Sequence, residues 1–172
     1  MRLLVFGQTG QVARELIRRV PADVSLITLG RGEADLSRPE TCAAAIRSAT
    51  VDAVINAAAC TAVDRAEAEE TEATIINGAA PAAMAIAAEA KGIPVLHIST
   101  DYVFDGAGDR PFLPGHSTGP LGAYGRSKLA GEQGVRDSGA RHLILRTSWV
   151  VSSHGSNFVK TMLRLGSDRS EL

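Results

Sequence analysis

The sequence predicts an α/β fold, a doubly wound parallel sheet, on three observations. Short apolar runs alternate with longer segments of helical periodicity along the chain, which is the order of strands and helices in parallel sheets. The first apolar run, residues 3–6, enters a glycine-bearing turn and then a helix. The 172 residues are 45% apolar and 22% charged, which suits one globular domain with a single core.

The first strand, turn and helix predict a phosphate-binding loop. Residues 3–6 form the strand, and residues 11–20 carry apolar side chains at helical spacing. The glycines between them allow a tight turn and a close approach to the backbone, so a pyrophosphate can rest on the helix N-terminus. The residues expected at this contact are Gly7, Thr9, Gly10, Gln11 and Val12. A glycine turn without a ligand has the same pattern, so this loop alone does not decide the function.

The end of the second strand, residues 24–29, bears on the type of dinucleotide. Enzymes that use NAD place Asp or Glu there to bond the ribose 2′-hydroxyl. This chain has Gly30-Arg31, and a guanidinium is a good partner for a 2′-phosphate, which favours NADPH over NADH. A solvated surface arginine is the alternative reading of Arg31.

The next elements follow the same alternation. Ser37 and Glu40 have the form of a capping box at the start of a helix that runs to about residue 48. The third strand, residues 51–56, ends in Ala57-Ala58-Ala59, whose small side chains let the backbone lie close to a ligand. The acidic stretch 67–72 indicates a solvated face. Residues 73–91 read as a buried helix that Pro81 kinks or begins, and Asn77 within it either orders a water or serves as a structural amide.

The residues with the clearest chemistry follow the fourth strand, residues 95–99. Thr100 stands at the strand's carboxyl end, where open parallel sheets bind ligands, so its hydroxyl can hold a carbonyl oxygen. Tyr124 and Lys128 are four residues apart, which places them on one face of a helix. A nearby ammonium is expected to lower the phenol pKa and make Tyr124 a usable acid. This spacing also arises by chance on helices, so its meaning depends on Thr100 and the glycine loop.

The remaining segments complete the expected fold. Residues 105–122 hold many glycines and prolines and predict a loop over the site. Residues 142–147 form a fifth strand, and Trp149 follows its carboxyl end, either as a pocket residue or as a buried core aromatic. Residues 157–165 read as another helix. The polar residues 166–172 show no closing helix or strand, which indicates an interrupted chain.

The composition narrows the classes of partner. The net charge is -1 and the cationic residues are not interleaved with aromatics, so we expect no nucleic-acid partner. The two cysteines, Cys42 and Cys60, lack the spacing of a metal site, so no metal is expected. The first apolar run is too short for a signal or membrane segment, which makes the cytoplasm the expected location. The sequence leaves a homodimer open.

Several motifs together resemble one family, the extended short-chain dehydrogenase/reductases. They are Gly7-Gln8-Thr9-Gly10-Gln11-Val12, Asn56-Ala57-Ala58-Ala59 with Thr61-Ala62-Val63-Asp64, Ser99-Thr100-Asp101-Tyr102-Val103-Phe104-Asp105-Gly106, Tyr124-Gly125 with Ser127-Lys128 and Gly131-Glu132, and Arg146-Thr147-Ser148-Trp149-Val150 with Asn157-Phe158. The likeness covers nearly the whole chain, and it is strongest to members that reduce the 4-keto group of dTDP-6-deoxy sugars.

This resemblance implies a dinucleotide-binding Rossmann domain over residues 1–150 and the truncated start of a substrate-binding region over 151–172. It implies hydride transfer from NADPH, or from NADH, to the keto group of a nucleotide sugar. Tyr124 would protonate the new alkoxide, Lys128 would bond the nicotinamide ribose, and Thr100 would hold the carbonyl oxygen. The remaining site residues that it implies are Asp35, Leu36, Ala57, Ala58, Ala59, Cys60 and Thr61 for the cofactor, and Asp101, Trp149 and Asn157 for the substrate.

Two other functions share these motifs. A sugar-nucleotide epimerase or dehydratase carries the same Thr, Tyr and Lys, although the glycine loop and the Thr100-Asp101 pair look more like the reductase. A regulatory subunit would keep the fold and bind a dinucleotide without turnover, and the complete set of Thr100, Tyr124 and Lys128 argues against it.

Overall fold

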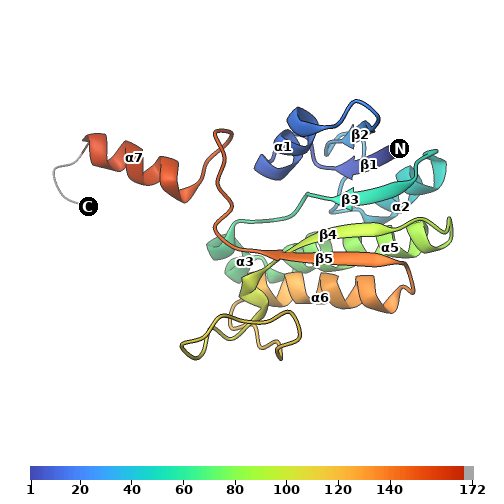
Figure 1. Cartoon of the computed structure of the whole chain (residues 1–172). Coiled ribbons are helices and arrows are strands. Elements are labelled where there is room, and N and C mark those ends of the chain that lie inside the picture. The colour runs from blue at the N-terminus through green and yellow to red at the C-terminus, as the bar shows by residue number, and fades with distance from the viewer. Residues whose placement is uncertain (169–172) are drawn as a thin grey trace.

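The computed structural model describes residues 1–168 and contains one five-stranded parallel sheet (Figure 1). The strands are β1 Arg2–Phe6, β2 Ser25–Leu29, β3 Ala53–Asn56, β4 Val95–Thr100 and β5 His142–Thr147. The α-helices are α1 Gln11–Arg19, α2 Pro39–Ser48, α3 Val63–Ala68, α4 Glu70–Thr74, α5 Ala80–Glu89, α6 Ala123–Asp137 and α7 Phe158–Asp168. A π-helical turn, η1 Ile75–Ala79, joins α4 to α5, and a 3₁₀ turn, η2 Asp101–Val103, follows β4.

The strand order, β2-β1-β3-β4-β5, confirms the predicted doubly wound sheet. All four strand pairings are parallel. The chain moves outward from β1 to β2 and then crosses back over β1 to β3, so right-handed crossovers place α1 and α2 on opposite faces. The order reverses beside β1, and in such sheets ligands bind at the carboxyl ends of the strands near this point.

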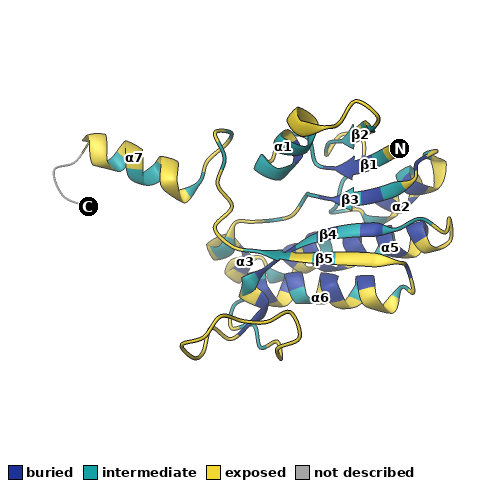
Figure 2. Cartoon of the chain, viewed as in Figure 1, coloured by how far each residue is buried: buried dark blue, intermediate teal, exposed yellow. Residues whose placement is uncertain are grey.

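The core lies between the sheet and the layer formed by α2, α5 and α6, which pack against one another (Figure 1). Leu4 and Phe6 of β1 contribute to it with Ile46 of α2 and Met84 of α5, and all four side chains are buried. The opposite face of the sheet is less covered. There the leucines of β5, Leu143 and Leu145, are exposed (Figure 2).

The helix predicted over 73–91 is divided in the structure. Pro81 lies in the first turn of α5, which confirms that it marks the start of a helix, and the π-helical turn precedes it. Proline has no N–H to bond the carbonyl four residues back, here that of Asn77. An additional helix, α3, lies ahead of this region and was not predicted from the sequence.

One local prediction is wrong, and another is confirmed but incomplete. Ser37 does not cap α2, because the helix begins at Pro39 with Arg38 as its N-cap. The N–H of Ser37 is bound to Asp35 Oδ1 at 3.0 Å. The acidic stretch 67–72 is more than a solvated face. Glu67 Oε1 accepts the N–H of Ala123 at 2.7 Å and Glu70 pairs with Arg126, so carboxylates from α3 and α4 meet the positive N-terminal end of α6.

The last helix, α7, has no buried residues and extends away from the sheet (Figure 1). Asn157 accepts the N–H of Lys160 at 3.1 Å and so caps its first turn. The expectation that residues 166–172 carry no helix is wrong for 166–168, since α7 runs to Asp168, while 169–172 lie outside the described residues. Within residues 1–168 no helix is long and apolar enough to cross a membrane.

Candidate active site

A cleft of about 910 Å³ lies at the carboxyl ends of the strands, beside the point where the strand order reverses. It brings together most of the residues predicted for the site. Its lining includes Gly7, Thr9, Gly10, Gln11, Val12, Arg31, Asp35, Leu36, Ala57, Ala58, Ala59, Thr61, Thr100, Asp101, Tyr124, Lys128 and Trp149. Cys60 and Asn157 are the predicted site residues that are not part of this lining.

The glycine loop has the backbone geometry of a ligand cradle. Gly7 has a φ of 117°, and a Cβ there would lie 3.3 Å from the Ala57 carbonyl oxygen. Gly10 is the N-cap of α1, where no side chain caps the helix and a Cβ would meet open space. The N–H groups of the first turn are thus open to an anion, and the residues present fit a pyrophosphate.

The end of β2 carries both signs of charge. The side chain of Arg31 is 80% exposed, with its Nε 3.9 Å from Asp35 Oδ1. Glu33, which the sequence analysis passed over, accepts the N–H of Gly30 at 2.8 Å and the Gln8 amide at 2.9 Å. An acid therefore reaches the end of β2 from three residues downstream, although it does not line the cleft.

Tyr124 and Lys128 both face the cleft from the first two turns of α6. Lys128 is only 2% exposed and its ammonium donates to the Ile98 carbonyl at 2.7 Å. Burial lowers the pKa of Lys128 to about 8, against the opposing charge of Glu132. Burial raises the pKa of Tyr124, against a hydrogen bond with the Thr100 hydroxyl. The expected lowering of the phenol pKa by Lys128 is therefore wrong for this structure, because desolvation dominates at Tyr124.

The strand end beside Tyr124 is held by a set of hydrogen bonds. The Thr100 hydroxyl donates to Asp101 Oδ1 at 3.1 Å and accepts the N–H of Tyr102 at 3.2 Å. Asp101 Oδ2 accepts the Ser148 hydroxyl at 2.7 Å, which links β4 to the segment after β5. The Tyr102 ring meets the Tyr124 ring edge-on, 5.5 Å between centroids. Tyr102 and Ser148 belong to the motifs quoted from the sequence, but no role was predicted for either.

Trp149 is a cleft residue and not a core aromatic. It is 75% exposed, and it has a φ of 51°, which is unusual for a residue other than glycine. Its ring meets Phe158 edge-on at 4.9 Å. Such strained backbone often occurs at ligand sites, which agrees with the position of Trp149 in the cleft lining.

The two predicted residues outside the lining have other contacts. Asn157 donates to Gln11 Oε1 at 2.9 Å and to the Ser152 carbonyl at 2.8 Å. Cys60 lines a smaller adjoining cavity of about 240 Å³, and both its backbone N–H and its carbonyl bond the Asn77 amide. Asn77 also bonds Ser127 Oγ at 3.0 Å, and these contacts support its reading as a structural amide.

The loop 105–122 lies elsewhere than predicted. None of its residues, all of which the structure describes, lines the cleft. It packs against the edge of the sheet, where Phe112 stacks on Phe104 at 4.3 Å and Arg146 donates to the Pro114 carbonyl at 3.2 Å. The expected cover over the site is thus wrong, because Phe112 and the Pro114 carbonyl in the middle of the segment attach it to Phe104 and to Arg146 of β5.

Comparison with known proteins gives the family. The family model described as RmlD substrate binding domain matches residues 1–172. The chain belongs to this family. A dTDP-4-dehydrorhamnose reductase from Sinorhizobium fredii is 49% identical over 172 residues, and one from Escherichia coli K12 is 48% identical over 176. Each alignment covers 100% of this chain, which spans 58% and 59% of the two relatives.

Solved structures of the same family have the same fold. A dTDP-4-dehydrorhamnose reductase from Clostridium acetobutylicum matches with a TM-score of 0.95 at 36% identity, over 100% of this chain and 61% of that protein. One from Bacillus anthracis, solved in complex with NADP, matches with a TM-score of 0.93 at 34% identity, over 99% of this chain and 61% of that one. The fold deduced from the strand order therefore agrees with that of experimentally solved family members.

Proposed function

We propose that this chain forms the cofactor site and catalytic centre of a reductase that acts on the 4-keto group of a dTDP-6-deoxy sugar with NADPH. The observation that carries the proposal is the meeting of Thr100, Tyr124 and Lys128 with the glycine loop in one cleft. Its relatives named dTDP-4-dehydrorhamnose reductase support the substrate class.

The cofactor would lie along the cleft from the end of β2 to α6. The first turn of α1 would hold the pyrophosphate and Arg31 the 2′-phosphate, while Ala57–Ala59 and Thr61 would form the wall and Asp35 and Leu36 would lie near the adenine. The NADP bound to the Bacillus anthracis relative supports NADPH. The acids near Arg31, Asp35 and Glu33, are also compatible with NADH.

The nicotinamide would supply the hydride, and the chain would supply the proton and the orientation. Thr100 would hold the carbonyl oxygen beside Tyr124, whose phenol is protonated at neutral pH and can donate to the more basic alkoxide that hydride transfer forms. The Lys128 ammonium would bond the nicotinamide ribose. Asp101 and Trp149 line the same cleft and would contact the sugar nucleotide.

The proposal divides the chain into two parts. Residues 1–150 would form the dinucleotide-binding domain, and residues 151–172 would begin a substrate-binding region. Two observations support this division: α7 has no buried residues, and the chain spans only 58% of the Sinorhizobium fredii relative. The free thiols of Cys42 and Cys60 suit a reducing compartment such as the cytoplasm.

The test is an assay of NADPH oxidation with a dTDP-4-keto-6-deoxy sugar. It uses the 172-residue chain and a chimera in which this chain is joined to the remaining part of the Sinorhizobium fredii relative. The chimera should oxidise one NADPH for each sugar reduced, and it should bind NADPH more tightly than NADH. Sugar conversion without net NADPH oxidation would indicate an epimerase or dehydratase, and NADPH binding with no turnover would indicate a regulatory subunit.

A further inference from the structure

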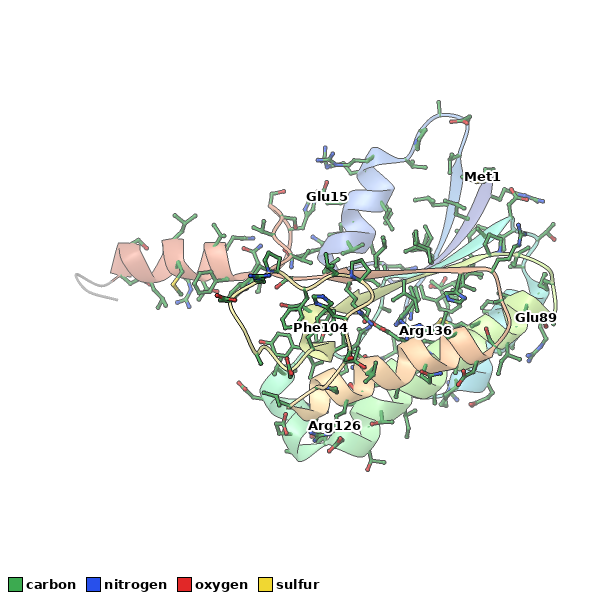
Figure 3. All side chains as sticks on the ribbon, turned by 60° about the horizontal axis from the view of Figure 1, so that its bottom comes forward. Met1, Glu15, Glu89, Phe104, Arg126 and Arg136 are labelled. Atoms are coloured by element: carbon green, nitrogen blue, oxygen red, sulfur yellow. The ribbon has the colours of Figure 1, made fainter. Side chains whose placement is uncertain are left out.

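The carboxylate of Glu132 is fully buried one helical turn beyond Lys128 on α6. Its Oε1 accepts hydrogen bonds from Ser99 Oγ at 2.6 Å and Arg146 Nε at 2.8 Å. Its Oε2 accepts from Arg146 Nη2 at 2.7 Å and Arg136 Nη2 at 2.9 Å. One side chain therefore ties α6 to β4 and to β5. Figure 3 shows Arg136 on α6 and Phe104 on the segment after β4. The guanidinium carbon of Arg146 lies 4.8 Å from the centroid of the Phe104 ring.

These bonds act on the two elements that carry the proposed chemistry. Ser99 is the residue before Thr100 at the end of β4, and Glu132 follows Tyr124 by two turns of α6. The Thr147 hydroxyl also donates to the Ser99 carbonyl at 3.2 Å, so the end of β4 is fixed from both sides. Loss of the Glu132 bonds would leave the position of Tyr124 along α6 less firmly fixed relative to Thr100. Small displacements of catalytic groups lower the rate of the chemical step markedly.

The carboxylate also lies one turn of α6 from a buried cation, Lys128, and its charge acts on that ammonium. The Lys128 ammonium is bound to a neutral carbonyl, that of Ile98, and a buried charge without compensation is unfavourable. His97 on β4 is fully buried and faces both Lys128 and Glu132, but burial lowers its pKa to about 3 and leaves it neutral. Glu132 raises the pKa of Lys128, while Arg146 and Arg136 bind the carboxylate itself.

We propose that Glu132 is a positioning residue of this site, which fixes α6 to the ends of β4 and β5 and places a negative charge one helical turn from Lys128. Its consequence for turnover rests on the proposed reductase function. The consequence for the lysine does not, since it depends only on the contacts of the folded chain.

The test is an NMR titration of the lysine side chains in the 172-residue protein. The three lysines are Lys91, Lys128 and Lys160, and the other two, which donate to surface carbonyls, serve as internal references. In Glu132→Gln the midpoint of Lys128 should fall by about one pH unit from its value near 8, with the references unchanged. The matched control is Glu70→Gln, which removes an exposed ion pair to the same helix and should leave Lys128 unchanged.

A second variant keeps the test decisive if Glu132→Gln does not fold. Arg146→Gln removes a cation but leaves the carboxylate with Ser99 and Arg136, so the Lys128 midpoint should rise. An unchanged Lys128 midpoint in whichever of these variants folds would overturn the proposal.

In the chimera, Glu132→Gln should lower kcat at least tenfold, and Glu132→Asp should restore the Lys128 midpoint more than the turnover. A wild-type chimera without turnover would refute the reductase function alone, because the lysine titration would still decide the role of Glu132.

Discussion

Tyr124 and Lys128 share a cleft, yet burial acts on them in opposite directions. It raises the pKa of the phenol and lowers that of the ammonium to about 8, because in both cases it favours the neutral form. The phenol is thus protonated at neutral pH, as a proton donor must be, but burial makes it a weaker acid than a free phenol. Burial brings the pKa of Lys128 close to neutral pH, and Glu132 opposes this effect by raising the pKa.

The stability of the chain should fall in mild acid because of His97. Burial holds the His97 pKa at about 3, below its ordinary value of 6.5. Between these values the unfolded chain binds a proton that the folded chain does not, so the free energy of unfolding should decrease as the pH falls, by up to about 1.4 kcal/mol per pH unit. Urea denaturation between pH 6.5 and 4.5 would measure this slope while most carboxylates stay ionised. His97→Gln should flatten it, and an equal slope in the variant would contradict the assignment.

The residues of the cleft could largely be predicted from the sequence because they follow strand ends. Thr100, Arg31 and Ala57 each come after an apolar run, and parallel strands end at one edge of the sheet. Pairings between distant residues could not be predicted in this way. Ser99 and Glu132 are 33 residues apart, and only the docking of α6 on β4 brings their side chains together.

Helix α6 docks closely because glycines form part of its buried face. A Cβ at Gly131 would clash with the Asn77 carbonyl oxygen, and one at Gly125 would clash with that of Tyr102. The Asn77 carbonyl is the group that Pro81 cannot bond, so the π-helical turn and the glycine of α6 meet at one point. The approach of α6 to η1 and β4 thus depends on the absence of a side chain.

Gly131→Ala should destabilise the fold by about 3 kcal/mol, since the backbone of η1 cannot yield without disturbing Asn77. The matched control is Gly166→Ala in α7, where a Cβ meets nothing within 4 Å. Alanine is the better helix former there and should leave stability unchanged or raise it by up to about 1 kcal/mol. The midpoints of thermal or urea unfolding of the two variants would show the difference, and equal stabilities would contradict the close packing.

The strands and most helices follow from apolar periodicity, and their bounds agree with the structure within a few residues. The division of the region before α5 does not follow from it. Glu67 and Glu70 bind the start of α6, and these contacts to a distant element decide where the short helices α3 and α4 lie. Similarly, the composition of the loop 105–122 predicts a place over the site, whereas the stacking of Phe112 on Phe104 and the bond from Arg146 to the Pro114 carbonyl hold the loop at the sheet edge.

In the whole molecule, the start of α1 and the segment before α7, which are far apart in the sequence, meet at the cleft. Gln11 at the start of α1 accepts bonds from Ser152 and Asn157, and Glu15 lies 3.0 Å from the His154 ring. The phosphate-binding loop and the segment that leads to α7 are therefore one structural unit. This contact explains why Asn157, expected at the substrate, lies outside the cleft lining and supports the glycine loop instead.

The central claim is that Tyr124 is the proton donor of a nicotinamide-dependent reduction. The most direct measurement compares Tyr124→Phe with wild type in the chimera, by single-turnover NADPH oxidation with the keto sugar and by calorimetry with NADPH. The phenol acts on the oxygen that gains charge in the transition state, so turnover should fall by about 100-fold or more while NADPH affinity stays within about twofold. Turnover close to that of the wild type would contradict the assignment of Tyr124 as the acid.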